Sequence, residues 1–384
     1  MNADPYLDFS TLAIHADMGV ESGSVDIAAP LHVSTTFEYP TDYNLRIALS
    51  KGVVTESDAL GAHLLSPGLP GKPQQDQPLV YSRMATTTRD RVESVLGALD
   101  HGHAVTYASG LAAIHAAFVF FNPSRIFMAR AGYHGSHGVL DLFKRGRQEV
   151  EVIFLSEADS MPPKDAVFKR GDLVWLEMPQ NPNGEIFDIP AFKARCETGA
   201  IVAVDLTFAP PPLMYGLDLG ADCVMHASTK FLGGHSDLLG GVLVVKDEEI
   251  AKGLRSDRTF LGSVMGNMEA WLLLRSLRTL DVRVLRQSES ATALAAWLAN
   301  PPEADAKALS VVAKVHHASL QQPDLLVRLN NARPSGVLAI EFTSAQHAIL
   351  MCNRLKLFKN ATSLGGVESL IDWRRAFDDK IAGG

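Results

Sequence analysis

Lys230 is the residue of this sequence whose neighbours point most clearly to chemistry. It ends the run His226-Ala227-Ser228-Thr229-Lys230, which follows an apolar segment typical of a buried strand. Ligands of open α/β sheets bind beyond the carboxyl ends of the strands, so a lysine here is expected to project into a crevice. A desolvated lysine loses its proton readily and can form a Schiff base with an aldehyde. An isolated lysine is more often a solvated loop residue, and the interpretation therefore depends on its neighbours.

Two further groups are expected at the same edge of the sheet. Asp205 ends the apolar segment 201–204, and a carboxylate there can hold a protonated ring nitrogen, although such an aspartate more often caps a turn. Ser109-Gly110-Leu111 opens an expected helix directly after a strand. The N–H groups and the dipole of a helix start bind phosphate. No Gly-x-Gly-x-x-Gly or Walker A pattern accompanies this segment.

Tyr133 follows the expected strand 126–129. An aromatic ring at this point can stack on a flat cofactor or belong to the core. A reactive lysine, an acid for a ring nitrogen, a phosphate-binding helix start and a stacking ring are together what pyridoxal 5'-phosphate (PLP) requires. The protonated pyridinium of PLP is the electron sink that stabilises a substrate carbanion. The four signals therefore predict a PLP site.

The elements that must position these residues alternate between helices and short strands. The strands are rich in Val, Ile and Leu and are apolar on both faces, as buried parallel strands are. Such alternation predicts a doubly wound α/β fold with a mostly parallel sheet and helices on both faces. The expected helices are 91–99, 110–121 and 192–198, and the expected strands are 104–107, 126–129, 152–155, 173–177, 201–206, 223–226 and 241–245.

Three parts are expected along the chain. Residues 1–78 are an N-terminal arm and long loop that contribute to a neighbouring subunit, and the stretch Pro40 to Pro78 within them is rich in turn signals. Residues 79–260 form the PLP-binding α/β domain. After about Phe260 the pattern changes to one long helix, 268–300, then strands 311–315 and 337–342 and a closing helix. Residues 261–384 are therefore expected to form a smaller α+β domain.

Composition excludes several classes of protein. The 384 residues include 35 Lys plus Arg and 43 Asp plus Glu, a net charge of −8 that argues against nucleic acid as the main partner. Three scattered cysteines have neither disulfide nor metal-ligand spacing, which favours a reducing compartment. The histidines also lack metal-ligand spacing, so no metal is expected. No signal peptide and no uninterrupted apolar span is evident, and a cytoplasmic location without a membrane partner is expected.

The order and spacing of the motifs resemble the Cys/Met-metabolism family of fold-type I PLP enzymes, which includes cystathionine γ-synthases, cystathionine lyases and O-acylhomoserine sulfhydrylases. The resemblance covers nearly the whole chain and implies an aspartate aminotransferase-like fold. It is carried by Thr11–His15, Tyr81-Ser82-Arg83, Ala108–Ala113, Trp175–Pro182, Asp205–Ala209, the Lys230 run and Ser363–Leu370.

The resemblance implies a role for each matching residue. Lys230 would form the Schiff base and move protons between substrate carbons, and Tyr133 would stack on the ring. Tyr81 and Arg83 would reach the cofactor of the neighbouring subunit, which implies a homodimer or homotetramer with shared sites. The catalytic residues implied are Lys230, Tyr133 and Tyr81. The implied cofactor-binding residues are Lys230, Asp205, Tyr133, Ser109, Gly110, Leu111, Thr207, Ser228, Thr229, Tyr81, Arg83 and Asn181, and the substrate-binding residues are Asn181, Thr362, Ser363 and Leu364.

Some positions depart from the family pattern. Ala227 replaces the usual Ser three residues before the lysine, and Ser228 follows it. Gly135 stands where methionine γ-lyases carry Cys, which argues against that activity. Thr362 stands where enzymes that handle cystathionine carry Glu, which suggests an acceptor other than cysteine. The family's later strand, with an arginine for the substrate carboxylate, has no counterpart before Gly384, so the C-terminal domain is expected to be truncated.

These features predict PLP-dependent γ-replacement on an O-acyl-L-homoserine. The acyl group leaves and a nucleophile adds at Cγ, and the departures favour a carbon or nitrogen acceptor of secondary metabolism. One alternative is a C–S lyase of the cystathionine γ- or β-lyase type, which shares the early steps. Another is a PLP-binding subunit without turnover.

Overall fold

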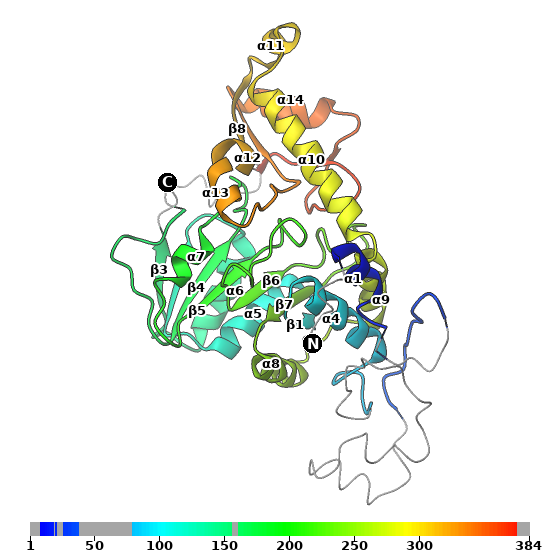
Figure 1. The fold of residues 1–384 in the computed structure, drawn as a ribbon. Coiled ribbons are helices and arrows are strands. Elements are labelled where there is room, and N and C mark those ends of the chain that lie inside the picture. The colour runs from blue at the N-terminus through cyan, green and yellow to red at the C-terminus, as the bar shows by residue number, and fades with distance from the viewer. Residues whose placement is uncertain (1–7, 19, 21–25, 38–78, 156–159, 375–384) are drawn as a thin grey trace, which may run out of the picture.

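A seven-stranded sheet is the frame of the molecule, shown in green and cyan in Figure 1. The computed structural model describes residues 8–18, 20, 26–37, 79–155 and 160–374, so the expected loop Pro40–Pro78 lies outside the described residues. The strand order is β1-β7-β6-β5-β4-β2-β3. The strands are β1 (His103–Tyr107), β2 (Arg125–Ala129), β3 (Glu151–Leu155), β4 (Asp172–Glu177), β5 (Ile201–Asp205), β6 (Cys223–His226) and β7 (Gly241–Val245).

Helices cover both faces of this sheet, which confirms the predicted α/β class (Figure 1). Alternate residues of one strand enter different cores. Trp175 of β4 packs with Phe118 on one face, whereas Val174 and Leu176 belong to the core on the other. One face is covered by α5 (Gly110–Phe121), α6 (His134–Arg145) and α8 (Glu248–Leu261), and the other by α4 (Thr87–Leu99), α7 (Ile189–Lys193) and α9 (Asn267–Leu277).

Strand β7 is the exception within the predicted mostly parallel sheet, because it runs antiparallel to both of its neighbours, β1 and β6. A parallel neighbour requires a crossover connection, usually a helix. Residues 227–240 between β6 and β7 form turns and no helix, so the chain returns directly beside β6. The loop that carries Lys230 makes this connection.

Three expected helices have different bounds. The helix expected at 91–99 is α4, which begins four residues earlier, where Thr86 caps the N–H of Arg89. The helix expected at 192–198 is α7, which begins after Asp188 caps the N–H of Ala191. It ends early because the backbone of Arg195 and Glu197 pairs with Phe168 instead. The long helix expected at 268–300 is two helices, α9 and α10 (Leu280–Ala299). They are separated because side chains of Thr279 and Arg283 bind the carbonyl of Ser276, which a continuous helix would use.

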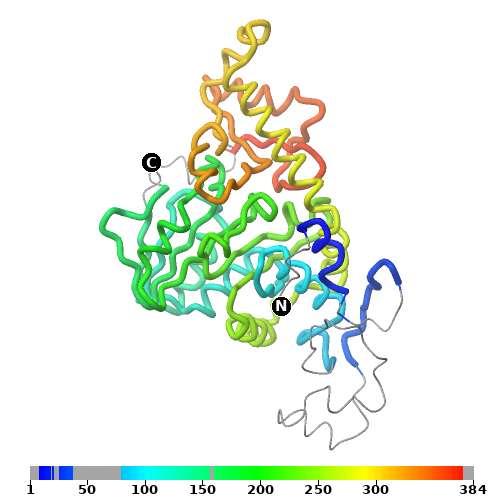
Figure 2. The backbone as a smooth tube through the Cα atoms, in the orientation of Figure 1, coloured from blue at the N-terminus to red at the C-terminus, as the bar shows by residue number. Residues whose placement is uncertain are grey.

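The first described helix, α1 (Phe9–His15), lies beside α9 and α10, as Figure 2 shows by the blue trace next to the yellow one. Ser10 donates to Asp281 of α10, and the indole N–H of Trp271 in α9 donates to the carbonyl of Ala29 (2.8 Å). Residues separated by more than 200 positions thus fix the N-terminal segment to the body of the molecule.

A smaller unit follows α10 and lies above the large sheet in Figure 1. Its core is small and includes Ala295, Leu298 and Val315. A domain division near residue 260 stays a prediction, since α8 and α9 on either side of it both pack on the large sheet. The unit contains α11 (Glu303–Leu309), β8 (Val312–His316), α12 (Ala318–Gln321), α13 (Pro323–Arg328), β9 (Ala339–Phe342), α14 (Ala345–Arg354), β10 (Lys359–Asn360) and β11 (Leu370–Ile371).

Candidate active site

The start of α5 has the geometry of an anion site. Ser109 is its N-cap, and the Ser109 hydroxyl accepts the N–H of Ala112 (3.1 Å). The N–H groups of Gly110 and Leu111 lie in the first turn, where a helix supplies no acceptor. A Cβ on Gly110 would lie 2.9 Å from the Ala227 methyl, so only glycine lets the helix approach the loop before Lys230 this closely.

Lys230 projects from this loop toward the C-terminal part of the chain. Its Nζ donates to the hydroxyl of Ser363 (2.8 Å). Burial lowers the pKa of Lys230, which favours the neutral, nucleophilic amine. The neighbouring Gly365 has a φ of +85°, and a Cβ there would lie 2.5 Å from the backbone nitrogen of Phe231. The segment that carries Ser363 therefore packs directly on the Lys230 backbone.

Asp205 lies at the end of β5 with only 5% of its surface exposed. Its Oδ1 accepts the N–H of Thr207 (2.9 Å), and the Thr207 hydroxyl accepts the N–H of Ala227 (2.8 Å). These bonds tie the acid to the loop that carries Lys230. Burial raises the pKa of Asp205, while the Thr207 hydrogen bonds and the charge of His226 oppose the rise.

His226 is buried behind Asp205 and forms an ion pair with buried Asp100, with 3.1 Å between Nε2 and Oδ2. Burial alone would lower the pKa of His226, but Asp100 outweighs it and the pKa is raised. A protonated imidazole at this position places positive charge behind the acid of the crevice.

Glu177 joins two loops of the site and was missed by the sequence analysis. Its Oε2 accepts the N–H of Tyr133 (2.7 Å) and its Oε1 accepts the N–H of Asn181 (2.9 Å). It is in register with Asp205 on the neighbouring strand. Burial and the charge of Asp205 raise the pKa of Glu177. An acid at the carboxyl end of the strand next to that of Asp205 was the available signal.

Tyr133 presents its ring at the surface of the crevice and is 37% exposed. Gly135 lies under the ring, since a Cβ there would overlap the Tyr133 side chain and come within 2.8 Å of Leu111. The pKa of Tyr133 is raised by burial and by the charges of Asp205 and Glu177. The positive charge of Arg374 opposes this rise. The charge of Arg374 also opposes the rise in the pKa of Glu177, so this charge reaches the crevice.

The structure brings most of the expected site residues together, but the Thr229 hydroxyl is bonded elsewhere, and the Ser228 hydroxyl is buried with no hydrogen-bond partner among the described residues. The Thr229 hydroxyl accepts the N–H of Gly240 (3.1 Å). The Ser228 side chain is fully buried, and its Oγ lies 3.1 Å from the place of a Cβ on Gly240. Ala227, not Ser228, is therefore the residue that faces the start of α5. Thr362 and Ser363 are exposed, and Leu364 packs against the main core.

Tyr81 and Arg83 are not brought into the Lys230 crevice of their own chain. Nη1 of Arg83 donates to the carbonyl of Thr259 (3.0 Å), and its guanidinium lies 5.4 Å from the centre of the Tyr81 ring. Tyr81 forms a backbone bridge with Thr36. Both side chains are exposed.

The chain was compared with known proteins. A model of the family described as Cys/Met metabolism PLP-dependent enzyme matches residues 10–377. The chain belongs to this family. A cystathionine gamma-synthase of Mycobacterium tuberculosis is 31% identical, with 94% of this chain and 85% of that protein covered. The cystathionine beta-lyase MetC of Bacillus subtilis is 32% identical, with 76% and 74% covered.

A solved structure described as the cystathione gamma lyase CalE6 from Micromonospora echinospora has the same fold. It is 28% identical, the match covers 98% of this chain and 91% of that one, and the TM-score is 0.77. This likeness confirms the fold-type I prediction. PLP is the cofactor of the family.

The crevice of this Cys/Met-metabolism enzyme fits PLP by its donors. A buried acid is available for a ring nitrogen at Asp205, and an amine of lowered pKa is available for an aldehyde at Lys230. The start of α5, whose first N–H groups have no acceptor within the helix, is available for a phosphate. Within the described ranges, no group of three or more His, Cys, Asp or Glu is arranged to hold a metal ion. Nor does any helix of those ranges have the length and apolarity that a membrane span needs.

Proposed function

We propose that the enzyme catalyses γ-replacement on an O-acyl-L-homoserine. The observation that carries this proposal is the Lys230 amine, whose pKa is lowered and whose Nζ lies 2.8 Å from the Ser363 hydroxyl. An amine of lowered pKa can, in its neutral form, both bind a cofactor aldehyde and accept a proton. The relative in M. tuberculosis named cystathionine gamma-synthase supports this class of reaction.

PLP, when bound, supplies the electron sink for carbanion chemistry on the substrate. Asp205 would hold its ring nitrogen in the protonated form, and Tyr133 would stack on the ring. The N–H groups of Gly110 and Leu111 would bind the phosphate, with Thr229 close by. Glu177 sets this arrangement because it holds the backbone of both the Tyr133 loop and the Asn181 loop.

Lys230 performs the proton transfers of this reaction. It takes a proton from the substrate Cα, then one from Cβ, while the acyloxy group leaves Cγ with its bonding electrons as a carboxylate. The nucleophile forms its bond at Cγ, and Lys230 returns the protons. Ser363 holds Nζ between these steps, and Ser363 with Arg374 would bind the substrate carboxylate.

The acceptor is proposed to be a nucleophile other than cysteine. Thr362 is exposed beside Ser363 and carries no charge. An uncharged side chain offers no ion pair to the distal amino group of a cysteine-derived product. A carbon or nitrogen nucleophile without that amino group suits this position better.

A C–S lyase is the second candidate, because the B. subtilis relative is named cystathionine beta-lyase. A lyase shares the early proton transfers of Lys230 but ends with water, and releases a 2-oxo acid, ammonia and a thiol. Formation of a 2-oxo acid and ammonia without any acceptor would distinguish this activity.

The cofactor site is also proposed to be shared between two copies of the chain. Tyr81 and Arg83 are exposed and contact Thr36, Thr259 and each other, and a second copy would receive them at its cofactor phosphate. A homodimer, or a homotetramer built from two such dimers, would complete each site.

The test is the visible absorption of the PLP-loaded enzyme before and after addition of O-acetyl-L-homoserine, with acetate release followed in the same sample. A band that shifts while acetate appears is expected, and Lys230→Ala should abolish both. A band that never responds, with no acetate, would overturn γ-replacement and favour a subunit that binds PLP without turnover.

A further inference from the structure

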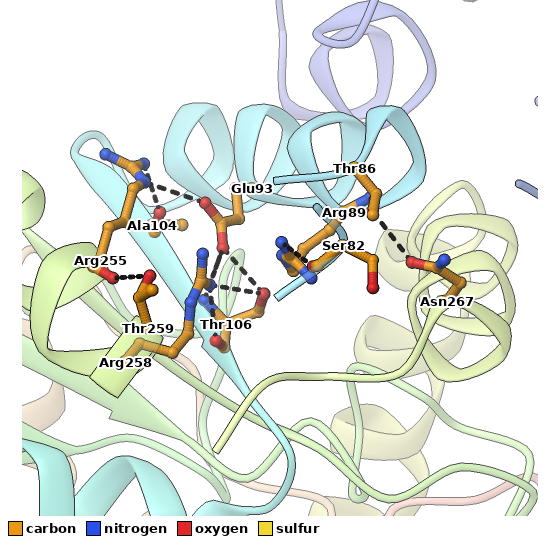
Figure 3. A network of polar contacts seen from close by, with 10 residues as sticks. All are labelled: Ser82, Thr86, Arg89, Glu93, Ala104, Thr106, Arg255, Arg258, Thr259 and Asn267. Atoms are coloured by element: carbon orange, nitrogen blue, oxygen red, sulfur yellow. Dashed lines mark hydrogen bonds and ion pairs between the residues drawn. The ribbon is translucent and has the colours of Figure 1, made fainter. Parts of the chain in front are cut away.

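A buried ionic network lies under the segment that carries Tyr81 and Arg83 (Figure 3). Its centre is Glu93 of α4, which is 6% exposed. Oε1 of Glu93 accepts from Nη1 of Arg258 (2.5 Å) and from the backbone and hydroxyl of Thr106 (2.9 and 2.8 Å). Oε2 accepts from Nε of Arg255 (3.1 Å). We call Glu93, Arg89, Arg255, Arg258 and Thr106 the Glu93 network.

Glu93 is the counter-charge that keeps this network together. Burial alone would raise the pKa of Glu93, but Arg258, Arg255 and Arg89 outweigh it and hold the pKa far below its usual range. Arg89 and Arg258 are each only 1% exposed. The Glu93 carboxylate therefore offsets the charge of both buried guanidiniums, and loss of its charge would leave Arg258 without its ion-pair partner.

The network holds the Tyr81–Arg83 segment by two routes. Nη2 of Arg89 donates to the carbonyl of Ser82 (2.9 Å). Arg255 and Arg258 fix the last turns of α8, where the carbonyl of Thr259 accepts Nη1 of Arg83 (3.0 Å). Figure 3 shows Ser82 and Arg89 on one side of Glu93 and the α8 residues on the other. Ser82 is thus bound to Arg89, whose charge Glu93 offsets, and Arg83 is bound to the helix whose Arg255 and Arg258 form ion pairs with Glu93.

We infer that Glu93 is a positioning residue for the cofactor site of the neighbouring subunit. It holds Arg89 and the end of α8, and these fix the segment from which Tyr81 and Arg83 reach the other chain. The inference rests on the proposed sharing of sites. It predicts that loss of the Glu93 charge weakens PLP binding in the partner and not in the chain that carries the substitution.

Mixed dimers test this directional effect. Two differently tagged chains are co-expressed, purified through both tags, titrated with PLP and treated with borohydride, and mass spectrometry then measures the fraction of Lys230 that carries reduced cofactor. In the first arm, a Lys230→Ala chain is paired with a Glu93→Gln chain. In the second, a chain with both substitutions is paired with a wild-type chain. Each arm has one trapping lysine and one altered Glu93, so any folding cost is the same.

The first arm should bind PLP as tightly as a dimer of Lys230→Ala and wild-type chains, because the trapping site receives Tyr81 and Arg83 from a chain with Glu93 intact. The second arm should require a PLP concentration roughly ten times higher to label half of its Lys230. Equal PLP affinities in the two arms would overturn the inference. Weaker binding in the first arm would also overturn it, because the effect would then lie in the site of the chain that carries the substitution.

Two controls separate this inference from the proposed function. Arg83→Ala in place of Glu93→Gln must show the same asymmetry, and its absence would refute site sharing itself. Asp172→Asn breaks a buried pair with Arg125 elsewhere in the sheet, where Nε and Oδ1 are 2.7 Å apart, and should give equal values in both arms. If the Glu93→Gln chain does not fold, Arg89→Lys, which shortens the donor to Ser82, takes its place in the same two arms with the same expected order.

Discussion

At the scale of single residues, the crevice depends on where charge is placed before the cofactor arrives. Lys230 is pushed toward its neutral form by burial, and Asp205 and Glu177 are two buried acids in register on neighbouring strands. Both acids have raised pKa values, so a cationic ring nitrogen would relieve their mutual repulsion. The Lys230 amine is thus complementary to the aldehyde of PLP, and the two neighbouring acids are complementary to its ring nitrogen.

The Ala227→Ser substitution should strengthen PLP binding. Ala227 faces the start of α5, so a hydroxyl there would add a donor to the phosphate, and a hydrogen bond to a charged group contributes about 1.5–3 kcal/mol. The dissociation constant of PLP, from equilibrium dialysis, should fall roughly tenfold. Ser228→Ala is the matched control, because that hydroxyl is buried beside Gly240 and its loss should leave affinity unchanged. Equal affinity of Ala227→Ser and wild type would contradict this account of the phosphate site.

Glu177 should make the cofactor-free enzyme less stable as the pH rises. Its pKa is raised from 4.5 to about 8, by burial first and then by Asp205. The folded protein therefore holds this proton more tightly than the unfolded chain, and the stabilisation is full below pH 4.5 and is lost as the pH approaches about 8. Glu177→Gln does not titrate and keeps one of the two acceptors.

The melting temperature of the cofactor-free protein, followed across this pH range, checks the Glu177 prediction. The fall in wild type should exceed that in Glu177→Gln by about 5 °C. Glu249→Gln is the control, since Glu249 is exposed on α8 and should leave the pH profile as in wild type. Parallel profiles for wild type and Glu177→Gln would refute the raised pKa.

At the scale of elements, the Lys230 loop and the Ser363 segment must pack without side chains between them. Gly365→Ala should break this contact, because its φ is +85° and its Cβ would lie 2.5 Å from the Phe231 nitrogen. Gly262→Ala is matched in backbone, with φ +72°, but its Cβ would meet nothing within 4 Å. The backbone strain alone costs about 1–3 kcal/mol at either position.

Both glycine variants should therefore lose stability in thermal unfolding, but only Gly365→Ala should also lose roughly tenfold or more in kcat/KM. Activity lost to the same extent in both variants would show that the Ser363 segment has no special part in the reaction.

The elements also show what the sequence could predict. Buried strands and the residues at their carboxyl ends follow local patterns, which is why Asp205, Tyr133 and the Lys230 run were found. The direction of β7 was not predictable from its own apolar residues, since an antiparallel central strand has the same pattern as a parallel one. In the sequence, Glu177 is one more acid at the end of a strand, and Glu93 is one of several charged residues on a helix. Their partners lie up to 165 positions away and are defined only by the fold.

At the scale of the whole molecule, several apolar side chains are exposed around the Tyr81 segment. Phe260 is 85% exposed at the end of α8, and Met84 and Met268 are also exposed nearby in the chain. The proposed second copy would cover this surface. Phe260→Asp should therefore yield monomers in sedimentation velocity and weaken PLP binding. Leu357→Asp, at an equally exposed residue of the smaller unit, should leave the dimer intact. A Phe260→Asp dimer with normal PLP affinity would contradict this interface.

The most direct test of the central claim is product analysis by mass spectrometry. The PLP-loaded enzyme is incubated with O-acetyl-L-homoserine alone and with each of a set of thiol, nitrogen and carbon nucleophiles. γ-Replacement predicts that, with a suitable acceptor, the acetate released is matched by a product that carries the acceptor at Cγ. A 2-oxo acid and ammonia that equal the acetate under every condition would contradict it and identify the enzyme as a lyase.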